Sequence, residues 1–179
     1  MKRTPALALV YLGLFSGLVY AAASVPKFKD YPVTSIYKGP IAPLVLDNEL
    51  AKTFKTRLRE ALKTRQPVFA GEYVVSQWGC GTSCVVTAFV NKKTGHVLEQ
   101  TFGGEYGPYI TEYRLNSRLL VAEGPVLDAQ NRDTGDYAAY FYLLAKGKLK
   151  RIQTVNIERP ADANHDGLPD ATTEPNNTI

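Results

Sequence analysis

Both cysteines of the chain lie in one short segment, residues 78–84, which also contains its only tryptophan. The segment reads WGCGTSC, and strand-like runs at 73–75 and 84–90 flank it. If Cys80 and Cys84 form a disulfide, they close a small glycine-rich loop at the end of a strand. Loops held on a scaffold in this way often carry binding residues. We therefore predict a binding loop formed by Trp78, Gly79, Gly81, Thr82 and Ser83.

The spacing of Cys80 and Cys84 bears on three kinds of cysteine chemistry. A redox dithiol normally has the shorter Cys-x-x-Cys spacing at the N-terminus of a helix, where the thiolate is stabilised. A structural zinc site needs two further ligands, and His96 and His165 are the only histidines of the chain. A structural disulfide needs no further ligand and is favoured in an oxidising compartment. We therefore predict that Cys80 and Cys84 are bonded to each other.

A second candidate binding loop, residues 103–109, is rich in glycine and contains Tyr106 and Tyr109. An enzymatic alternative uses carboxylates near the first loop, because hydrolysis of a glycosidic bond needs two of them beside that bond. Five glutamates lie on or near expected strands: Glu72, Glu99, Glu105, Glu112 and Glu123. Acyl transfer has weaker support, since Ser83 lacks the Gly-x-Ser-x-Gly turn and only His96 would serve as its base.

The C-terminal part of the chain contains oxygen ligands at a spacing that suits calcium. Side-chain oxygens at loop positions 1, 3, 5 and 9, with a glycine at position 6, are typical of compact Ca²⁺ loops. Thr173 stands where an EF-hand has its bidentate glutamate, so we predict weak, about millimolar binding. The alternative is a solvated acidic tail. The predicted ligands are Asp162, Asn164, Asp166, the backbone carbonyl of Leu168, and Asp170.

Residues 1–23 have the parts of a secretory signal. Lys2 and Arg3 form a positive start, residues 7–19 are an apolar run, and three alanines supply a cleavage site before Ser24. The apolar run is too short for a comfortable transmembrane helix. We therefore predict a periplasmic or secreted protein without a stable membrane anchor. Removal of the two basic residues lowers the formal net charge from +4 to +2, which is too small to indicate a nucleic-acid partner.

One amphipathic helix is predicted from about Asn48 to Gln66, with Asp47 as its N-cap and Pro67 after its end. Its apolar residues follow helical spacing and are Leu50, Phe54, Leu58, Ala61 and Leu62. After it the pattern becomes strand-like, with strands expected at 70–77, 84–91, 96–102, 110–115, 118–123, 137–145 and 149–156.

Short turns between these strands indicate an antiparallel meander, since parallel neighbours need long crossovers. We predict an α+β fold in which the N-terminal helix packs on one antiparallel sheet of six or seven strands. Residues 24–157 would form this single domain, with loops at 103–109 and 124–136. Residues 158–179 have no apolar periodicity, and we expect them to be an acidic tail outside the domain.

Three short patterns occur in order: FAGxY from Phe69, WGCGxxC from Trp78, and YRLxSRLL from Tyr113. The chain resembles in this respect a family of exported, uncharacterised bacterial proteins, and the resemblance spans residues 69–152. It implies export and no particular activity. The layout of strand, short Cys-to-Cys loop, strand and hairpin is also similar to that of the periplasmic lysozyme inhibitors. That family places a histidine between its cysteines, where this chain has residues 81–83. The acidic segment at 162–170 resembles the loops of EF-hands, dockerins and thrombospondin type 3 repeats.

Two hypotheses of different classes follow from these observations. In the first, the protein is a non-enzymatic binding or inhibitor-like protein of the cell envelope, and its disulfide-closed loop binds an envelope protein or glycan. In the second, it is an envelope hydrolase that uses carboxylates near the same loop. Two carboxylates in a cleft beside Trp78 would favour the enzyme, whereas a protruding loop would favour the binding protein.

Overall fold

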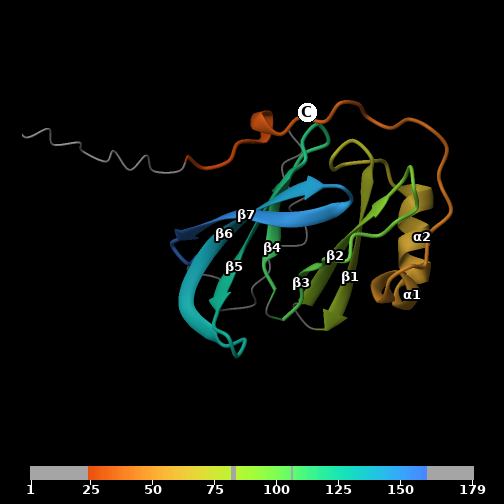
Figure 1. Ribbon diagram of the computed structural model, residues 1–179. Coiled ribbons are helices and arrows are strands. Elements are labelled where there is room, and N and C mark those ends of the chain that lie inside the picture. The colour runs from red at the N-terminus through yellow and green to blue at the C-terminus, as the bar shows by residue number, and fades with distance from the viewer. Residues whose placement is uncertain (1–23, 82–83, 106, 161–179) are drawn as a thin grey trace, which may run out of the picture.

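The chain folds into two antiparallel sheets with two short helices on one side (Figure 1). The computed structural model describes residues 24–81, 84–105 and 107–160. The first sheet has the order β1-β2-β3, with β1 Tyr73–Gly81, β2 Cys84–Asn91 and β3 Phe102–Gly103. The second has the order β4-β5-β6-β7, with β4 Tyr109–Tyr113, β5 Leu119–Leu127, β6 Asp133–Ala145 and β7 Lys148–Ile157. The α+β class and the antiparallel pairing are confirmed, but the strands form two sheets instead of one.

The predicted signal at 1–23 and the greater part of the predicted tail, 161–179, lie outside the described residues. Residues 24–47, which precede the helices and which we call the lead-in, are irregular apart from a short 3-10 helix, η1 Phe28–Asp30, and an isolated bridge at Pro32. The lead-in is tied to the domain by main-chain bonds at several points, including Val33 N–H to the carbonyl of Asn116 and Val45 N–H to the carbonyl of Gly95. The lead-in is therefore part of the folded unit.

The predicted helix is divided in two at Phe54. The pieces are α1 Glu49–Thr53 and α2 Lys55–Thr64, and the prediction of one continuous helix was wrong. The N-cap is Asn48 and not Asp47, because the Asn48 side chain accepts a hydrogen bond of 2.8 Å from the N–H of Ala51. Asp47 instead lies 2.7 Å from a ring nitrogen of His96.

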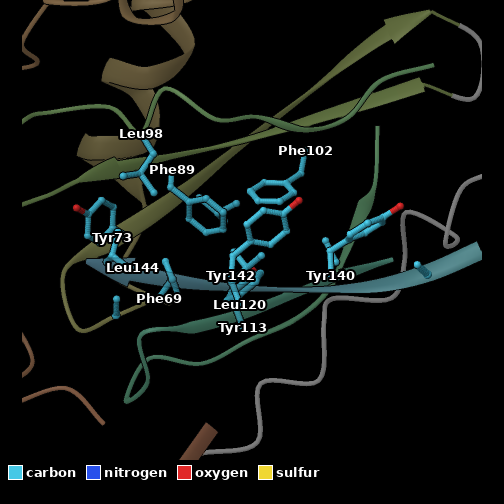
Figure 2. Packing of buried hydrophobic residues seen from close by; sticks show 14 residues of the cluster. Phe69, Tyr73, Phe89, Leu98, Phe102, Tyr113, Leu120, Tyr140, Tyr142 and Leu144 are labelled. Atoms are coloured by element: carbon cyan, nitrogen blue, oxygen red, sulfur yellow. The ribbon is translucent and has the colours of Figure 1, made fainter. Parts of the chain in front are cut away.

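The main hydrophobic core lies between the two sheets (Figure 2). Aromatic rings from both sheets meet there at edge-to-face or tilted angles, as aromatic pairs prefer. Phe102 of β3 meets Tyr142 of β6 at 5.3 Å between ring centroids, and Phe89 of β2 meets Tyr113 of β4 at 5.7 Å. Burial of these large rings fixes the face-to-face packing of the two sheets.

Each sheet also covers apolar residues on its outer face. The helices pack on the outer face of the first sheet, where Leu58, Ala61 and Leu62 meet Val74 and Val90. The outer face of the second sheet is partly covered by the lead-in, whose residues Phe28 and Tyr31 pack on Leu119, Val121, Ala139 and Phe141. From one side to the other, the layers are the helices, the first sheet, the second sheet and the lead-in.

Two strand predictions differ from the structure. The strand expected at 96–102 is reduced to β3, because the chain before it makes only an isolated bridge from Val97 to Val90. The loop expected at 124–136 is shorter, since β5 continues to Leu127 and β6 begins at Asp133. Pro125 is accommodated beside a register shift, which is a place where a strand tolerates proline.

Candidate functional site

The two cysteines close the end of the β1–β2 hairpin. Cys80 and Cys84 are bonded, with their Cα atoms 5.1 Å apart, and the predicted disulfide is confirmed. The pairing of the strands shifts between Gly79 and Gly81, so Cys80 is an extra residue in β1 with no partner in register. We call Gly79, Cys80, Gly81 and Cys84 the hairpin end. Thr82 and Ser83, which were predicted as part of the binding loop, lie outside the described residues.

The backbone at Gly81 explains one glycine of this segment. Its φ is +146°, a conformation that residues with a side chain rarely adopt. No atom lies within 4 Å of the position of a Cβ at Gly81, so the space there is open. Gly79 has ordinary backbone geometry, and a Cβ there would meet only the carbonyl oxygen of Cys84, at 3.8 Å. The hairpin end therefore needs glycine at position 81, but not at position 79.

Trp78 is not presented on the loop as the sequence suggested. Its side chain is 6% exposed and belongs to the core between the helices and the first sheet. The indole stacks on Phe54, with 4.4 Å between ring centroids and 29° between planes. Trp78 shares its strand face with Val74, four residues earlier, because side chains of a strand alternate between faces. We therefore assign Trp78 to the support of the hairpin end and not to its contact surface.

The sandwich does not cover the hairpin end. Val75 and Phe89 face the second sheet and are buried in the main core. Gln77 lies two residues further along the same face of β1 and is exposed, as are Gly79, Cys80 and Gly81. Since the buried run ends at Val75 on this face, the last part of β1 extends past the second sheet. The hairpin end is thus held from the helix side and open on the other.

The second predicted loop lies beside β2, close to the first. The N–H of Gly104 donates to the carbonyl of Val85, the residue after Cys84, at 3.0 Å. The hydroxyl of Tyr109 donates to the carbonyl of Gly104 at 2.6 Å and closes the loop from inside. Partial burial raises the pKa of Tyr109 above its ordinary value of 10.0, which extends to more alkaline pH the range in which the hydroxyl is a donor. The structure therefore brings Tyr109 near the hairpin end, while Tyr106 lies outside the described residues.

Two grooves are found elsewhere on the surface. The His96 groove has a volume of about 580 Å³ and contains the carboxylates of Asp47, Glu72 and Glu99. Glu72 accepts a hydrogen bond of 2.9 Å from the side chain of Asn91, and Asp47 pairs with His96. None of the residues of the hairpin end lines this groove, and neither does Trp78.

The Phe28 groove has a volume of about 620 Å³ and lies between the lead-in and the outer face of the second sheet. It contains Glu112 and Glu123, each with a partner already. Glu112 pairs with Arg114 at 2.6 Å, and Glu123 lies 3.5 Å from the hydroxyl of Thr111. Trp78 and the hairpin end do not line it either. Four of the five candidate glutamates therefore line grooves away from the predicted loop. The fifth, Glu105, is exposed and follows Gly104 in the second loop, beside the hairpin end.

The predicted calcium ligands Asp162, Asn164, Asp166, Leu168 and Asp170 all lie outside the described residues. Over residues 24–81, 84–105 and 107–160, no group of three or more His, Cys, Asp or Glu side chains is placed to hold a metal ion. In the same ranges, no helix is long and apolar enough to span a bilayer. The calcium prediction thus depends on sequence spacing alone.

Comparison of the chain with protein-family models, with curated proteins and with solved structures finds no match. The family resemblances drawn from the sequence therefore stay predictions. What the site does must be inferred from its own geometry.

Proposed function

We propose that this protein is an exported, non-enzymatic binding protein, inhibitor-like in presenting a rigid hairpin end to another envelope protein or to a glycan. The observation that carries the proposal is the contrast between neighbouring residues of β1. Trp78 is buried against Phe54, whereas Gly79, Cys80 and Gly81 are exposed. An exposed segment that is anchored at its base and closed by a disulfide loses little conformational freedom on binding, which favours affinity.

The neighbouring loop enlarges the surface available to a partner. It is attached to β2 through Gly104 and Val85 and is closed by Tyr109. Both segments are thus fixed by hydrogen bonds or a covalent bond before any partner arrives. Main-chain groups of the described residues that are held in this way suit contact with a partner with little change of shape.

The location of the protein is supported by the disulfide. Bonded cysteines persist in the periplasm and outside the cell and are rare in the reducing cytosol. The signal-like residues 1–23 agree with this location. The partner would accordingly be a component of the envelope or its surroundings.

The hydrolase alternative requires two carboxylates in a cleft beside the hairpin end. The His96 groove and the Phe28 groove contain carboxylates, but the hairpin end lines neither of them. The surface around the hairpin end contains glycines, the disulfide, Gln77 and Tyr109, and of the five candidate glutamates only Glu105 lies in the adjoining loop. This composition suits contact better than acid–base chemistry, so the binding proposal has the stronger support.

The test is capture of envelope components by immobilised protein, comparing wild type with Gly81→Asp. A matched control is Gly147→Asp in the β6–β7 turn, because Gly147 also has a positive φ (+72°) and open space around it. Detergent extracts of the envelope supply proteins, and purified insoluble envelope glycan supplies the second arm. We expect the same component to be bound by wild type and Gly147→Asp but lost with Gly81→Asp. Equal recovery by all three would remove the hairpin end from the mechanism.

A further inference from the structure

Strand β1 is one edge of the first sheet, since the strand order is β1-β2-β3 (Figure 1). An edge strand presents main-chain N–H and C=O groups that no neighbouring strand uses. Natural proteins usually protect such edges with charged side chains, proline, bulges or a covering segment.

The hydrogen bonds of Tyr73 show which residues of β1 point to the free edge. Its N–H donates to the carbonyl of Phe69 at 2.9 Å, and its carbonyl accepts from Val68 at 2.9 Å, so neither group is used by β2. In an antiparallel pair, the main-chain groups of successive residues point alternately toward the neighbouring strand and away from it. The groups of Val75, Gln77 and Gly79 therefore point to the same free edge as those of Tyr73.

The opposite strand confirms this alternation. In register, Val75 faces Phe89 and Gly79 faces Val85. The carbonyls of Phe89 and Val85 are used on the far side of β2, by the N–H groups of Leu98 and Gly104, each at 3.0 Å. Their partners on β1 consequently direct their own groups outward. β1 thus carries a free edge from Val75 to Gly79.

The outer part of this edge is open. Val75 is buried, but Gln77 and Gly79 are both exposed. Within residues 24–81, 84–105 and 107–160, no turn or loop hydrogen bond engages the main-chain groups of Gln77 or Gly79. The helices pack on the face of β1 that carries Val74 and Trp78.

The edge of β1 also lacks protective residues. No charged residue and no proline occurs between Tyr73 and Gly81. By contrast, β7 is an edge of the second sheet and carries Lys148, Lys150 and Arg151. The register shift at Cys80 ends regular pairing only beyond Gly79. The edge at β7 therefore carries charged residues, and the edge at β1 does not.

We propose that the edge of β1 from Val75 to Gly79 binds an extended segment of a partner protein by strand addition. This inference rests on the proposed binding function and specifies its partner class as a peptide main chain, in preference to a glycan. Residues two apart on a strand lie about 6.6 Å from each other, and each presents one donor and one acceptor to the edge. An extended peptide carries donors and acceptors with the same repeat, whereas a sugar chain does not.

The probe is a linear peptide selected from a phage-displayed random library on the wild-type protein. The main variant is Gln77→Pro, which removes an edge-facing N–H that no ladder bond uses, a position where proline is tolerated. Its matched control is Gln77→Ala, which removes the side chain but keeps the N–H. We expect Gln77→Pro to weaken peptide binding about tenfold, and Gln77→Ala to change it by about twofold or less. Equal weakening by both variants would overturn strand addition.

Two measurements on wild-type protein keep the test independent of how well Gln77→Pro folds. The selected peptide is prepared in two forms, N-methylated either at its odd-numbered or at its even-numbered residues. Only one form should bind, because only every second N–H of the peptide faces the edge of β1. Amide exchange at Gln77 and Gly79 should be fast in the free protein and slowed by the peptide. Indifference to the N-methylation pattern, or unchanged exchange at both amides, would contradict the proposal. If the protection of these amides increases with protein concentration in the absence of peptide, the edge pairs with a second copy of the chain. That result would also overturn the proposal.

The outcome is separable from that of the proposed function. If Gly81→Asp abolishes capture of an envelope component while Gln77→Pro does not, the hairpin end binds by another geometry and strand addition is rejected. If both variants retain capture, the proposed function itself fails.

Discussion

The ring of Phe54 stacks on the indole of Trp78, and this contact joins the break between the two helices to the strand residue that precedes the hairpin end. The backbone of Phe54 (φ −105°, ψ 23°) lies near the bridge region between the helical and extended conformations, so α1 ends and α2 starts at this residue. The contact therefore couples the position of the helices to that of Gly79 and Cys80. It gives the hairpin end a rigid base on the helix side.

Replacement of Trp78 should destabilise the whole fold. We expect Trp78→Ala to lower the free energy of unfolding by about 3–5 kcal/mol, as is typical for a large buried aromatic side chain. The neighbouring Gln77→Ala should cost about 1 kcal/mol or less, since it removes an exposed side chain and its hydrogen bond to Thr87. Urea denaturation of both variants measures the difference. Similar small losses would show that the indole contributes little to the core.

Removal of the disulfide should leave a folded protein. The loop closed by Cys80 and Cys84 is short. Its restriction of the unfolded chain therefore contributes only about 2 kcal/mol to the free energy of unfolding. We expect Cys80→Ser with Cys84→Ser to unfold cooperatively at a lower temperature, with the contact of Phe54 and Trp78 intact. Calorimetry tests this prediction, and alkylation of unreduced wild-type protein checks the bond itself. A non-cooperative transition in the double variant would mean that the bridge holds the domain together.

The sequence predicted the apolar side of the helices better than their continuity. Leu50, Phe54, Leu58, Ala61 and Leu62 all pack on the first sheet as their spacing indicates. A change of φ and ψ at one residue hardly alters such spacing, so the break at Phe54 leaves no signal in the pattern. The burial of Trp78 did leave a signal in the sequence. Trp78 is four residues after Val74, and residues an even number of positions apart on a strand lie on the same face.

The division into two sheets could not be read from the sequence. The alternation of apolar residues is the same in a single meander and in a sandwich. It shows which side chains of a strand lie on one face, but not which strands pair with each other. The separation depends on long-range packing, such as Phe102 of β3 against Tyr142 of β6. The free edge of β1 was hidden for the same reason, since it exists only because β1 pairs with β2 alone. The nearness of Tyr109 to Cys84 depends on the pairing of β2 with β3 and on the hydrogen bonds that Gly104 makes with Val85 and Tyr109.

Alkaline pH should unfold the protein through tyrosines of the main core. Burial raises the pKa of Tyr73, Tyr140 and Tyr142 above the ordinary value of 10.0. The unfolded chain then loses these protons at lower pH than the folded one. The stability they contribute is complete below pH 10.0 and is lost as pH rises through the higher folded values. Urea denaturation from pH about 9 to 11 should show this decline, with a smaller slope for Tyr142→Phe. An unchanged slope would exclude Tyr142 from the effect.

Acid should weaken the attachment of the chain after β7. Arg159 donates to both carboxylate oxygens of Asp133, at 2.7 and 2.8 Å, and these bonds hold the pKa of Asp133 below its ordinary value of 3.8. The resulting stability is present above pH 3.8 and is lost as pH falls through the lower folded value. The Asp133 carboxylate is exposed and Arg159 is half-buried, so Asp133→Asn should cost only about 0.5 kcal/mol at neutral pH, and less at high salt.

The control for this pair is Asp136→Asn. Arg159 contacts only the main-chain carbonyl of Asp136, so this variant removes the same charge without removing that contact. Amide exchange over residues 155–159 should increase in Asp133→Asn and not in Asp136→Asn. An equal response of the two variants would attribute the effect to net charge.

The last prediction concerns calcium. Asp162, Asn164, Asp166 and Asp170 supply oxygens at alternating loop positions, but Thr173 replaces the bidentate carboxylate that completes an EF-hand loop. Loss of up to two ligand oxygens should leave an affinity in the range of about 10⁻³ M. In an NMR titration of the full-length protein, we expect Ca²⁺ to shift resonances of residues 162–170 and to leave those of the hairpin end unchanged. Asp166→Ala should abolish the shifts, whereas Asp136→Asn should preserve them, because Asp136 belongs to β6 and not to the loop. Shifts that persist in Asp166→Ala, or that follow Mg²⁺ equally well, would reduce the segment to an acidic extension with ordinary counter-ion binding.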